Sequence, residues 1–402
     1  MRFELAATWG LALAAATTEG SVEVRRVGAP AANATGCVID KSGATCSRGD
    51  GEIETIPLEE LISVEFGRRR SGAPVAGEPA VVLLHDGSRL VGSVTGGSQE
   101  SLRIALLPGF DVETPIDTIS ALFLGPRAPR LERGRFEVST KEDALFKRPE
   151  VGGDYTRGTL QSFSAAGCEF EYTLGTAKFP WSELEAITLA RQVEVKPAAP
   201  PLVHADLLPD GSLTGTLVRF GDGGLELRPP GFPADVVLPA DLLRSLRFDG
   251  PRHAWLSDLA PAAVEQTPFL GRSDQFLFPW RADRSVTGRP LAVGGRLFAK
   301  GFGCHSRTRL DFNLSAQDAQ FEAFVGVADE VLELADRGAI SFAVLLDDKE
   351  VWRSAVMRAG DAAVKVGPLP LAGAKRLTLL TDYGEGEDVA DRGVWGNALL
   401  LR

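Results

Sequence analysis

Apolar residues follow the same spacing after a proline in four segments of the N-terminal part of the chain. An apolar residue lies four, seven and nine positions after each proline, and a carboxylate lies two or three positions after it. Proline suits the start of a helical turn, a carboxylate suits the positive end of that turn, and the later spacing is that of a strand. Each segment therefore predicts one short turn that leads into a buried strand. The four prolines are Pro57, Pro115, Pro180 and Pro239.

Hairpin patterns precede two of these segments. Residues 84–94 and 208–217 each carry an Asp-Gly turn and a later glycine that is typical of a strongly bent strand. A short bent five-stranded unit closed by one turn resembles a small Sm-like or SH3-like barrel, and the prolines recur about every sixty residues. We therefore predict four barrel-like repeats. Their expected limits are residues 21–70, 79–127, 150–192 and 202–250.

Proline-rich segments separate the predicted repeats, at residues 68–79, 125–134 and 195–201. Because such composition is semi-rigid, we expect it to keep neighbouring repeats apart. No element is predicted for residues 135–153.

Charge bears on what the repeats contact. The chain of 402 residues has 43 Lys and Arg against 54 Asp and Glu, which gives a net charge of −11. Sm-like barrels often bind RNA, but these repeats lack aromatic residues beside basic stripes, and an acidic chain opposes phosphate contacts. We expect no nucleic-acid partner. The repeats are predicted to be spacers or protein-contact modules, with an envelope protein as the candidate partner.

The first residues of the chain indicate a compartment. Residues 1–20 have an early arginine and then an apolar run that ends in Ala14-Ala15-Ala16. The run is too short to span a bilayer and fits a secretory signal peptide, although a short buried helix is the alternative. No other stretch predicts a membrane span. We therefore expect a secreted, periplasmic or cell-envelope protein without a transmembrane anchor after cleavage.

The four cysteines divide into a pair and two isolated residues. Cys37 and Cys46 flank a predicted hairpin, and a turn at Lys41-Ser42 places them opposite one another. A disulfide between them would agree with an oxidising compartment. Cys168 and Cys304 lie among apolar or glycine residues and are predicted to be small core residues.

The pattern of the chain changes after residue 251. Apolar and polar residues alternate with period two at residues 321–325, 340–344 and 377–379, and short turns separate these runs. This alternation predicts a two-sheet sandwich. The predicted fold class is therefore all-β, with several small bent-sheet barrel repeats followed by a β-sandwich.

Five motifs follow one another within residues 252–402. They are Leu-Ser-Asp-Leu at 256–259, Ala-Lys-Gly-x-Gly-x-His at 299–305, Phe-x-x-x-Val-Gly-Val-x-Asp-Glu at 321–330, the strand at 340–344 with Trp352, and Asp-x-x-x-Trp at 391–395. In this order they resemble the NPCBM family of carbohydrate-binding modules. The resemblance implies a galactose-binding-like jelly-roll sandwich with a non-catalytic role in binding glycans, and galactose-type sugars are candidates.

Sugar-binding modules stack an aromatic ring on a pyranose and bind its hydroxyls with carboxylates, amides or arginine. His305 has the alternative role of capping buried backbone, Trp395 has the alternative of core packing, and residues 278–280 are an alternative aromatic platform. The candidate carbohydrate-binding residues are His305, Asp382, Tyr383, Asp391, Arg392 and Trp395.

The last motif departs from the family pattern. The family carries Asp-His-Ala-Asp-Trp-Ala-Asp, whereas this chain reads Asp-Arg-Gly-Val-Trp-Gly-Asn at residues 391–397, so a histidine and two carboxylates are missing. If these groups hold calcium or sugar in relatives, that function is weakened here. Asp382 and Asp388 remain candidate Ca²⁺ ligands within an acidic stretch, and a solvated acidic loop is the alternative.

Catalytic signatures are missing from the sequence, which has no Gly-x-Ser-x-Gly, His-Glu-x-x-His or phosphate-binding glycine loop. We therefore expect a protein that is not an enzyme. The first hypothesis is a non-catalytic carbohydrate-binding protein of the cell exterior or envelope. The second is a structural or scaffolding envelope protein whose sandwich has little affinity for sugar.

Overall fold

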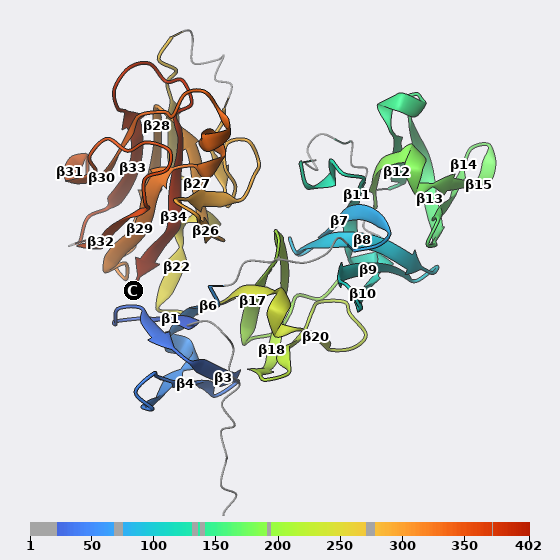
Figure 1. Ribbon diagram of the computed structural model, residues 1–402, viewed down its shortest axis with the longest axis horizontal. Coiled ribbons are helices and arrows are strands. Elements are labelled where there is room, and N and C mark those ends of the chain that lie inside the picture. The colour runs from blue at the N-terminus through green and yellow to red at the C-terminus, as the bar shows by residue number, and fades with distance from the viewer. Residues whose placement is uncertain are drawn as a thin grey trace, which may run out of the picture.

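The computed structural model is all-β and has two parts, a system of paired N-terminal repeats and a C-terminal sandwich (Figure 1). It describes residues 22–67, 75–130, 136, 141–190, 194–270, 278–371 and 373–402. The predicted signal segment, residues 1–20, lies outside these described residues. Within them, no helix is both long enough and apolar enough to cross a membrane.

The N-terminal part contains four successive repeats. The first has β1 (Val22–Arg26), β2 (Ala32–Ala34), β3 (Gly36–Asp40), β4 (Gly43–Ser47), β5 (Ile53–Pro57), η1 (Leu58–Glu60) and β6 (Leu61–Glu65). The second has β7 (Glu78–Leu84), β8 (Arg89–Gly97), β9 (Ser101–Leu107), β10 (Phe110–Pro115), η2 (Ile116–Thr118), β11 (Ile119–Leu124) and η3 (Ala128–Arg130).

The other two repeats follow the same order. The third has β12 (Asp143–Lys147), η5 (Pro149–Val151), β13 (Tyr155–Phe163), β14 (Gly167–Tyr172), β15 (Gly175–Pro180), η6 (Trp181–Glu183) and β16 (Leu184–Thr188). The fourth has β17 (Leu202–Leu207), β18 (Gly211–Gly221), β19 (Gly224–Arg228), β20 (Val236–Leu238), η7 (Ala240–Leu242) and β21 (Leu243–Phe248).

The strands of each repeat form a bent sheet whose last strand returns to pair with its first. In the second repeat, β7, β8, β9 and β10 pair in succession, and β11 pairs with β7. The bend in β8 requires a glycine at position 92, because a Cβ there would lie 2.1 Å from the carbonyl oxygen of Ala105. The prediction of small bent-sheet repeats is confirmed.

The proline-led turns are also confirmed. Pro57, Pro115 and Pro180 each end a strand and Pro239 follows one directly, and a 3₁₀ turn of three residues comes after each proline, at η1, η2, η6 and η7. The strand after each turn carries the predicted apolar residues into the interior, and every residue of β11 is buried. Local sequence therefore determines both the turn and the direction of the strand that follows it.

The expectation that linkers keep neighbouring repeats apart was wrong. The last strand of the first repeat, β6, pairs with the last strand of the fourth, β21, and β11 pairs with β16 in the same way. A last strand that pairs only with its own first strand leaves one edge open, and pairing with a neighbour satisfies that edge. The third repeat also begins before residue 150, its expected limit, because β12 pairs with β13 and β16.

Both predictions about the cysteines are confirmed. Cys37 and Cys46 lie opposite one another on β3 and β4 and form a disulfide. Cys168 and Cys304 are free and buried. Burial raises the pKa of each of these two thiols to about 12. They are therefore inert core residues at neutral pH.

The C-terminal part is a sandwich of two antiparallel sheets and a small hairpin. One sheet runs β24-β27-β34-β29-β32 with β22 beside β34, the other runs β23-β28-β33-β30-β31, and β25 pairs with β26. The elements are β22 (His253–Trp255), η8 (Leu256–Asp258), β23 (Ala263–Gln266), β24 (Arg281–Ala282), β25 (Leu291–Val293), β26 (Arg296–Phe298), β27 (Gly301–His305), β28 (Thr308–Asn313), β29 (Gln320–Val327), η10 (Asp329–Glu333), β30 (Ile340–Leu346), β31 (Lys349–Arg353), β32 (Val364–Pro370), β33 (Arg376–Tyr383) and β34 (Arg392–Leu401).

The sequence motifs of the sandwich have structural reasons. Lys300, which is buried, donates to Asp258 at 2.5 Å and to Asp283 at 2.6 Å, so it ties the Leu-Ser-Asp turn to the start of β27. Gly301 has a φ of +136°, and a Cβ there would lie 1.9 Å from the carbonyl oxygen of Trp395. These residues therefore fix how β27 meets β34.

The sandwich rests on the first and fourth repeats. The C-terminal end of β34 lies beside the first repeat, whereas the second and third repeats extend to the other side of the molecule (Figure 1). Val27 and Ile62 of the first repeat form one apolar cluster with Trp255, Leu399 and Leu401. Around this cluster, ion pairs join the two parts of the chain, as between Arg25 and Glu322 at 2.5 Å and between Arg284 and Asp210 at 2.5 Å.

Candidate functional site

The candidate site is a pocket lined by the start of β34 and by neighbouring loops. The end of the sandwich where β34 begins lies opposite the end that contacts the first repeat (Figure 1). The volume of the pocket is about 510 Å³, and its walls come from loops that are far apart in the sequence. We call it the loop-end pocket. It is lined by Pro268, Leu270, Phe278, His305, Leu334, Ala335, Asp336, Asp388, Val389, Ala390 and Arg392.

One wall of the loop-end pocket is a group of three side chains. His305 ends β27 and Arg392 begins β34, and the two residues face each other across the strands. The rings of Phe278 and His305 are stacked, with centroids 5.1 Å apart, and the Arg392 guanidinium lies 5.2 Å from the centre of the Phe278 ring. The structure therefore brings together two of the predicted residues, His305 and Arg392, with Phe278 of the alternative platform.

Hydrogen bonds hold this wall in place. The Nδ1 of His305 lies 2.9 Å from the carbonyl oxygen of Ser306, which can only accept, so this nitrogen donates. Arg392 Nη1 lies 3.4 Å from Glu330 Oε1, whereas Arg392 Nε is buried without a hydrogen-bond partner among the described residues. Arg392 therefore retains a donor that its neighbours in the protein do not satisfy.

The opposite rim of the pocket is apolar and exposed. Leu270 is 71% exposed, Val389 is 53% exposed and Leu334 is 37% exposed, and each comes from a different loop. Asp336 and Asp388 also line the pocket and supply carboxylate oxygens. A concave site with an apolar rim and a few polar groups has the composition that small-ligand pockets generally have.

Asp391 is buried, and both of its carboxylate oxygens accept hydrogen bonds from other groups of the protein. Its Oδ2 accepts from Ser306 Oγ at 2.6 Å, and its Oδ1 accepts from the backbone N–H of Ala339 at 2.8 Å. Burial raises the pKa of Asp391, and its neutral partners compensate only in part. Asp391 therefore positions the loops around residues 306 and 339 and presents no free oxygen to the pocket, contrary to the prediction of a sugar contact.

Trp395 lies in the core of the sandwich instead of at its surface. The side chain is fully buried, its Nε1 donates to Thr381 Oγ1 at 3.0 Å, and its ring packs edge-on against Phe342. A ring enclosed in this way has no face for a pyranose, so the packing alternative describes its position. Trp280 likewise packs against the core, and of the aromatic platform only Phe278 lines the pocket.

Asp382 and Tyr383 lie beside the pocket and support one of its loops. Asp382 is 3.4 Å from Arg307 and 3.6 Å from Arg353, which together balance its charge. The Tyr383 hydroxyl donates to the carbonyl oxygen of Thr267 at 2.6 Å, and its ring packs edge-on against Phe269. Both residues are therefore positioned to hold the wall that carries Leu270.

The structure gives the predicted calcium site no support. Asp388 Oδ2 accepts from the backbone N–H of Phe269 at 2.9 Å, and Asp382 faces two arginines. Across the ranges that the structure describes, no three His, Cys, Asp or Glu side chains are grouped so as to hold a metal ion. Ca²⁺ prefers six to eight oxygen ligands, which these two carboxylates do not provide.

Several residues of the pocket were missed by the sequence analysis. Leu270, Leu334, Asp336 and Val389 belong to no family motif, and nothing in a linear pattern shows that their loops meet. Isolated exposed leucines and valines are common on protein surfaces, so their composition alone carried no signal. The one signal in the sequence was that three loops of otherwise polar residues each carry a large apolar residue, namely Leu270, Leu334 and Val389.

The fold and this pocket define a β-sandwich domain with a binding-type cavity among its end loops. Residues 252–401 match the NPCBM/NEW2 domain, and this part of the chain is therefore an NPCBM domain, a carbohydrate-binding module.

Two curated proteins are similar to parts of the chain. A Renibacterium salmoninarum protein named "Putative endo-alpha-N-acetylgalactosaminidase" is 32% identical over 117 residues, which are 28% of this chain and 7% of that protein. "Alpha-1,3-galactosidase B" of Akkermansia muciniphila is 31% identical over 106 residues, 25% of this chain and 13% of that protein. The chain thus spans only a small part of the length of either relative.

Two solved structures are also similar to the chain. The CBM51 module of a Clostridium perfringens GH95 protein, in complex with methyl-galactose, is 26% identical, with 37% of this chain and 99% of that chain covered and a TM-score of 0.32. Tandem CBM51 modules of a family 98 glycoside hydrolase from Streptococcus pneumoniae are 12% identical. The match covers 94% of this chain and 92% of that chain, with a TM-score of 0.31.

Proposed function

We propose that this protein binds glycans without modifying them, and that the loop-end pocket of the NPCBM domain is the binding site. The observation that carries the proposal is the arrangement of Phe278, His305 and Arg392 facing an exposed rim of Leu270, Leu334 and Val389. The rim offers apolar contact to the C–H face of a sugar ring. The Arg392 guanidinium and the Asp336 and Asp388 carboxylates are of the types that bind hydroxyl groups.

Galactose-type sugars are the class that we propose. The names of both curated relatives refer to galactose or N-acetylgalactosamine, and the similarity to each falls at about the 30% level over a hundred or more residues. The match is to a family of carbohydrate-binding modules and concerns only this domain. The glycan preference is therefore the part of the proposal that needs the most direct test.

The test is isothermal titration of the full chain with methyl galactoside, N-acetylgalactosamine and methyl glucoside. We expect saturable binding of at least one galacto-configured sugar, and we expect Phe278→Ala and Arg392→Gln each to weaken it about tenfold. Lys349→Gln, an exposed change on β31, is the matched control and should bind as the unaltered protein does. Equal affinity in all three variants would contradict the assignment of the pocket.

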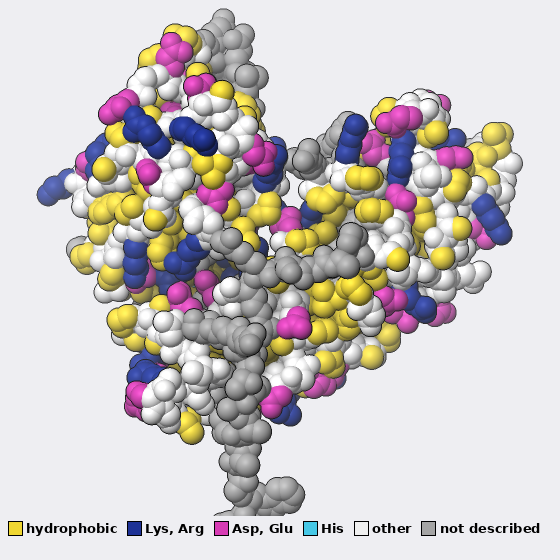
Figure 2. Space-filling view, viewed as in Figure 1, with side chains coloured by type: hydrophobic (Ala, Val, Ile, Leu, Met, Phe, Trp, Pro, Cys, Tyr) yellow, Lys and Arg dark blue, Asp and Glu magenta, His cyan; other side chains and the backbone are white. Residues whose placement is uncertain are grey.

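A second candidate function is a structural or scaffolding role in the cell envelope. It is favoured by the four repeats, which pair through β6 with β21 and through β11 with β16, and β18 of the fourth repeat pairs with β8 of the second. On the face shown in Figure 2, acidic and basic side chains of the described residues are interspersed, which suits a protein partner better than a phosphate backbone. Retention on no glycan, together with saturable capture of a purified envelope protein, would favour this role.

We also propose that the protein acts outside the cytoplasm. The disulfide between Cys37 and Cys46 is of the kind that persists in oxidising compartments, and the apolar run within residues 1–20 has the form of an export signal. Mass spectrometry of the protein from its source should find a chain that lacks about the first twenty residues. A cytoplasmic chain with four free thiols would contradict this proposal.

A further inference from the structure

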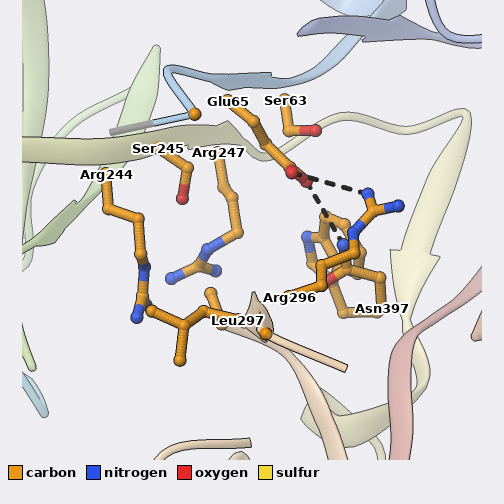
Figure 3. Close-up of a pocket in the computed structure, with 12 residues that line it drawn as sticks. Ser63, Glu65, Arg244, Ser245, Arg247, Arg296, Leu297 and Asn397 are labelled. Atoms are coloured by element: carbon orange, nitrogen blue, oxygen red, sulfur yellow. Dashed lines mark hydrogen bonds and ion pairs between the residues drawn. The ribbon is translucent and has the colours of Figure 1, made fainter. Parts of the chain in front are cut away.

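A second cavity lies where the sandwich meets the first and fourth repeats (Figure 3). Its volume is about 190 Å³, smaller than the loop-end pocket and below the usual range for drug-sized ligands. We call it the arginine cleft. The residues that matter here are Ser63 and Glu65 of β6, Arg244, Ser245 and Arg247 of β21, Trp255 of β22, Arg296 of β26 and Asn397 of β34.

Strand pairing sets one wall of the arginine cleft. Because β6 and β21 are antiparallel neighbours, Ser245 lies opposite Glu65 and Arg247 lies opposite Ser63. The other wall comes from the sandwich, where Arg296 and Asn397 reach toward Glu65. The cleft therefore exists only because the repeats and the NPCBM domain are joined as they are.

Two of the three arginines are neutralised within the protein. Arg247 makes two parallel hydrogen bonds of 2.9 Å to the carboxylate of Asp206. Arg296 lies 3.5 Å from Glu65 and 3.4 Å from Glu23, and Glu65 also accepts from Asn397 at 3.3 Å. Figure 3 shows the side chain of Glu65 directed at Arg296 and Asn397 on the sandwich side of the cleft.

Arg244 is the exception. Among the described residues it has no ion pair, and its Nη1 is buried without a hydrogen-bond partner. Its guanidinium lies beside that of Arg247, and both extend from β21 toward Leu297 (Figure 3). Asp206 is bound to Arg247, and Glu65 and Glu23 are bound to Arg296, so the carboxylates at the cleft match its arginines in number while none of them forms an ion pair with Arg244.

An independent observation comes from Trp255. Its side chain is only 4% exposed and lines the cleft, and its Nε1 is likewise buried without a partner in the described part of the chain. Buried donors without partners are rare in native proteins, because each costs about 1 to 3 kcal/mol. Two such donors at one cavity point to an acceptor that the chain itself does not supply.

We propose that the arginine cleft binds the carboxylate of a single acidic sugar residue, a hexuronate, with Arg244 as the principal contact. A carboxylate accepts from guanidinium and indole N–H donors, so it satisfies the Arg244 donor that the described residues leave without a partner. Ser63, Asn397 and Glu65 provide the mixed donors and acceptors that ring hydroxyls require. The arginine cleft and the loop-end pocket share no lining residue, so binding at the cleft does not depend on glycan binding at the pocket.

The experiment is titration of the full chain with galacturonate, galactose and inorganic sulfate. Galacturonate and galactose differ only at C6, so the comparison isolates the carboxylate. We expect saturable binding of galacturonate, with galactose and sulfate each at least tenfold weaker at this site. Arg244→Gln should weaken galacturonate at least tenfold, Arg244→Lys should weaken it less, and Arg228→Gln, which changes an exposed arginine of β19, should have no effect.

Nuclear magnetic resonance of the indole N–H groups locates the site. Galacturonate should shift the Trp255 signal, assigned with a Trp255→Phe variant, and leave that of Trp395 unchanged. A shift of the Trp255 signal by galactose or sulfate as large as that by galacturonate would overturn the proposal, as would unaltered galacturonate affinity in a folded Arg244→Gln variant. Saturable binding of galacturonate that leaves the Trp255 signal unchanged would also overturn it.

Discussion

The loop-end pocket and the arginine cleft each have a buried carboxylate in their supporting structure, and the pKa values of these two groups move in opposite directions. Asp391 under the pocket has neutral partners, a hydroxyl and a backbone amide, so burial dominates and raises its pKa. Asp206 beside the cleft is also buried, which alone would raise its pKa, but Arg247 and Arg244 lower it to about 2. Burial alone therefore does not decide the charge of a site; the partner does.

The same contrast extends to how the two sites are built. The pocket takes its walls from loops that are held by single hydrogen bonds to backbone groups. The cleft takes its walls from paired strands that are held by ion pairs. A loop site can present apolar side chains in several directions, whereas a site on paired strands holds charged groups at a fixed register.

Removal of the Trp395 indole from the core of the sandwich should have the largest effect. Trp395→Ala leaves a cavity between the sheets and removes the hydrogen bond to Thr381, so the free energy of unfolding should fall by about 3 to 5 kcal/mol. Denaturation in urea measures it. Trp395→Phe should lower stability less and leave glycan affinity unchanged. A selective loss of affinity in Trp395→Phe would contradict the placement of this ring in the core.

Asp206→Asn should have the next largest effect. The change leaves the guanidinium of Arg247, which is 12% exposed, without its carboxylate, and removal of one partner of a buried pair costs about 3 kcal/mol. Thermal denaturation of the full chain measures this loss. The matched control is Asp235→Asn, which breaks the exposed pair with Arg228 and should cost less than about 1 kcal/mol. Equal losses in the two variants would contradict the contrast between them.

The pH dependence of stability should carry the opposite signs of the two carboxylates. The pKa of Asp206 is lowered in the folded protein. Its contribution to the free energy of unfolding, about 2 kcal/mol, is therefore present above pH 4 and is lost as the pH falls toward 2. The pKa of Asp391 is raised in the folded protein. Its contribution to the free energy of unfolding therefore falls as the pH rises through the range just above 4. Unfolding curves of Asp206→Asn and Asp391→Asn across pH 2 to 6 should change slope in opposite senses. The same change of slope in both variants would refute this assignment.

The smallest effect is expected at the wall of the pocket. Tyr383→Phe removes the hydrogen bond to Thr267 but keeps the ring against Phe269, so stability should fall by about 1 kcal/mol or less. Because this bond positions the loop that carries Leu270, glycan affinity should fall about threefold, as titration would show. Tyr172→Phe in the third repeat is the control. An unchanged affinity would mean that the loop keeps its position without this bond.

Much of the fold could be predicted from local patterns. The proline-led turns, the facing cysteines and the alternation of the sandwich strands are short-range features, because a turn or a hairpin depends on residues only a few positions apart. The pairing of β6 with β21 and of β11 with β16 could not be predicted in this way. Any exposed edge strand can accept a neighbour, and the sequence does not say which one.

The candidate site was predicted only in part for the same reason. His305 and Arg392 follow from the motifs at residues 299–305 and 391–395, and the structure places both at the pocket. Trp395 belongs to the second of these motifs and is a core residue, because strand alternation turns it to the interior beside Phe342. A motif thus marks residues that matter for the domain, without separating those that pack from those that face a ligand.

By itself, the sequence determined the all-β class, the repeated turns, the disulfide and the NPCBM domain, since these depend on spacing along the chain. Only the tertiary structure decided that four separate segments meet around the loop-end pocket and that Asp206 of β17 binds Arg247 of β21. The first arrangement joins residues more than a hundred positions apart, and the second joins Asp206 to an arginine 41 positions further along the chain. Their geometry depends on how whole sheets pack, and no local pattern of side chains encodes that packing.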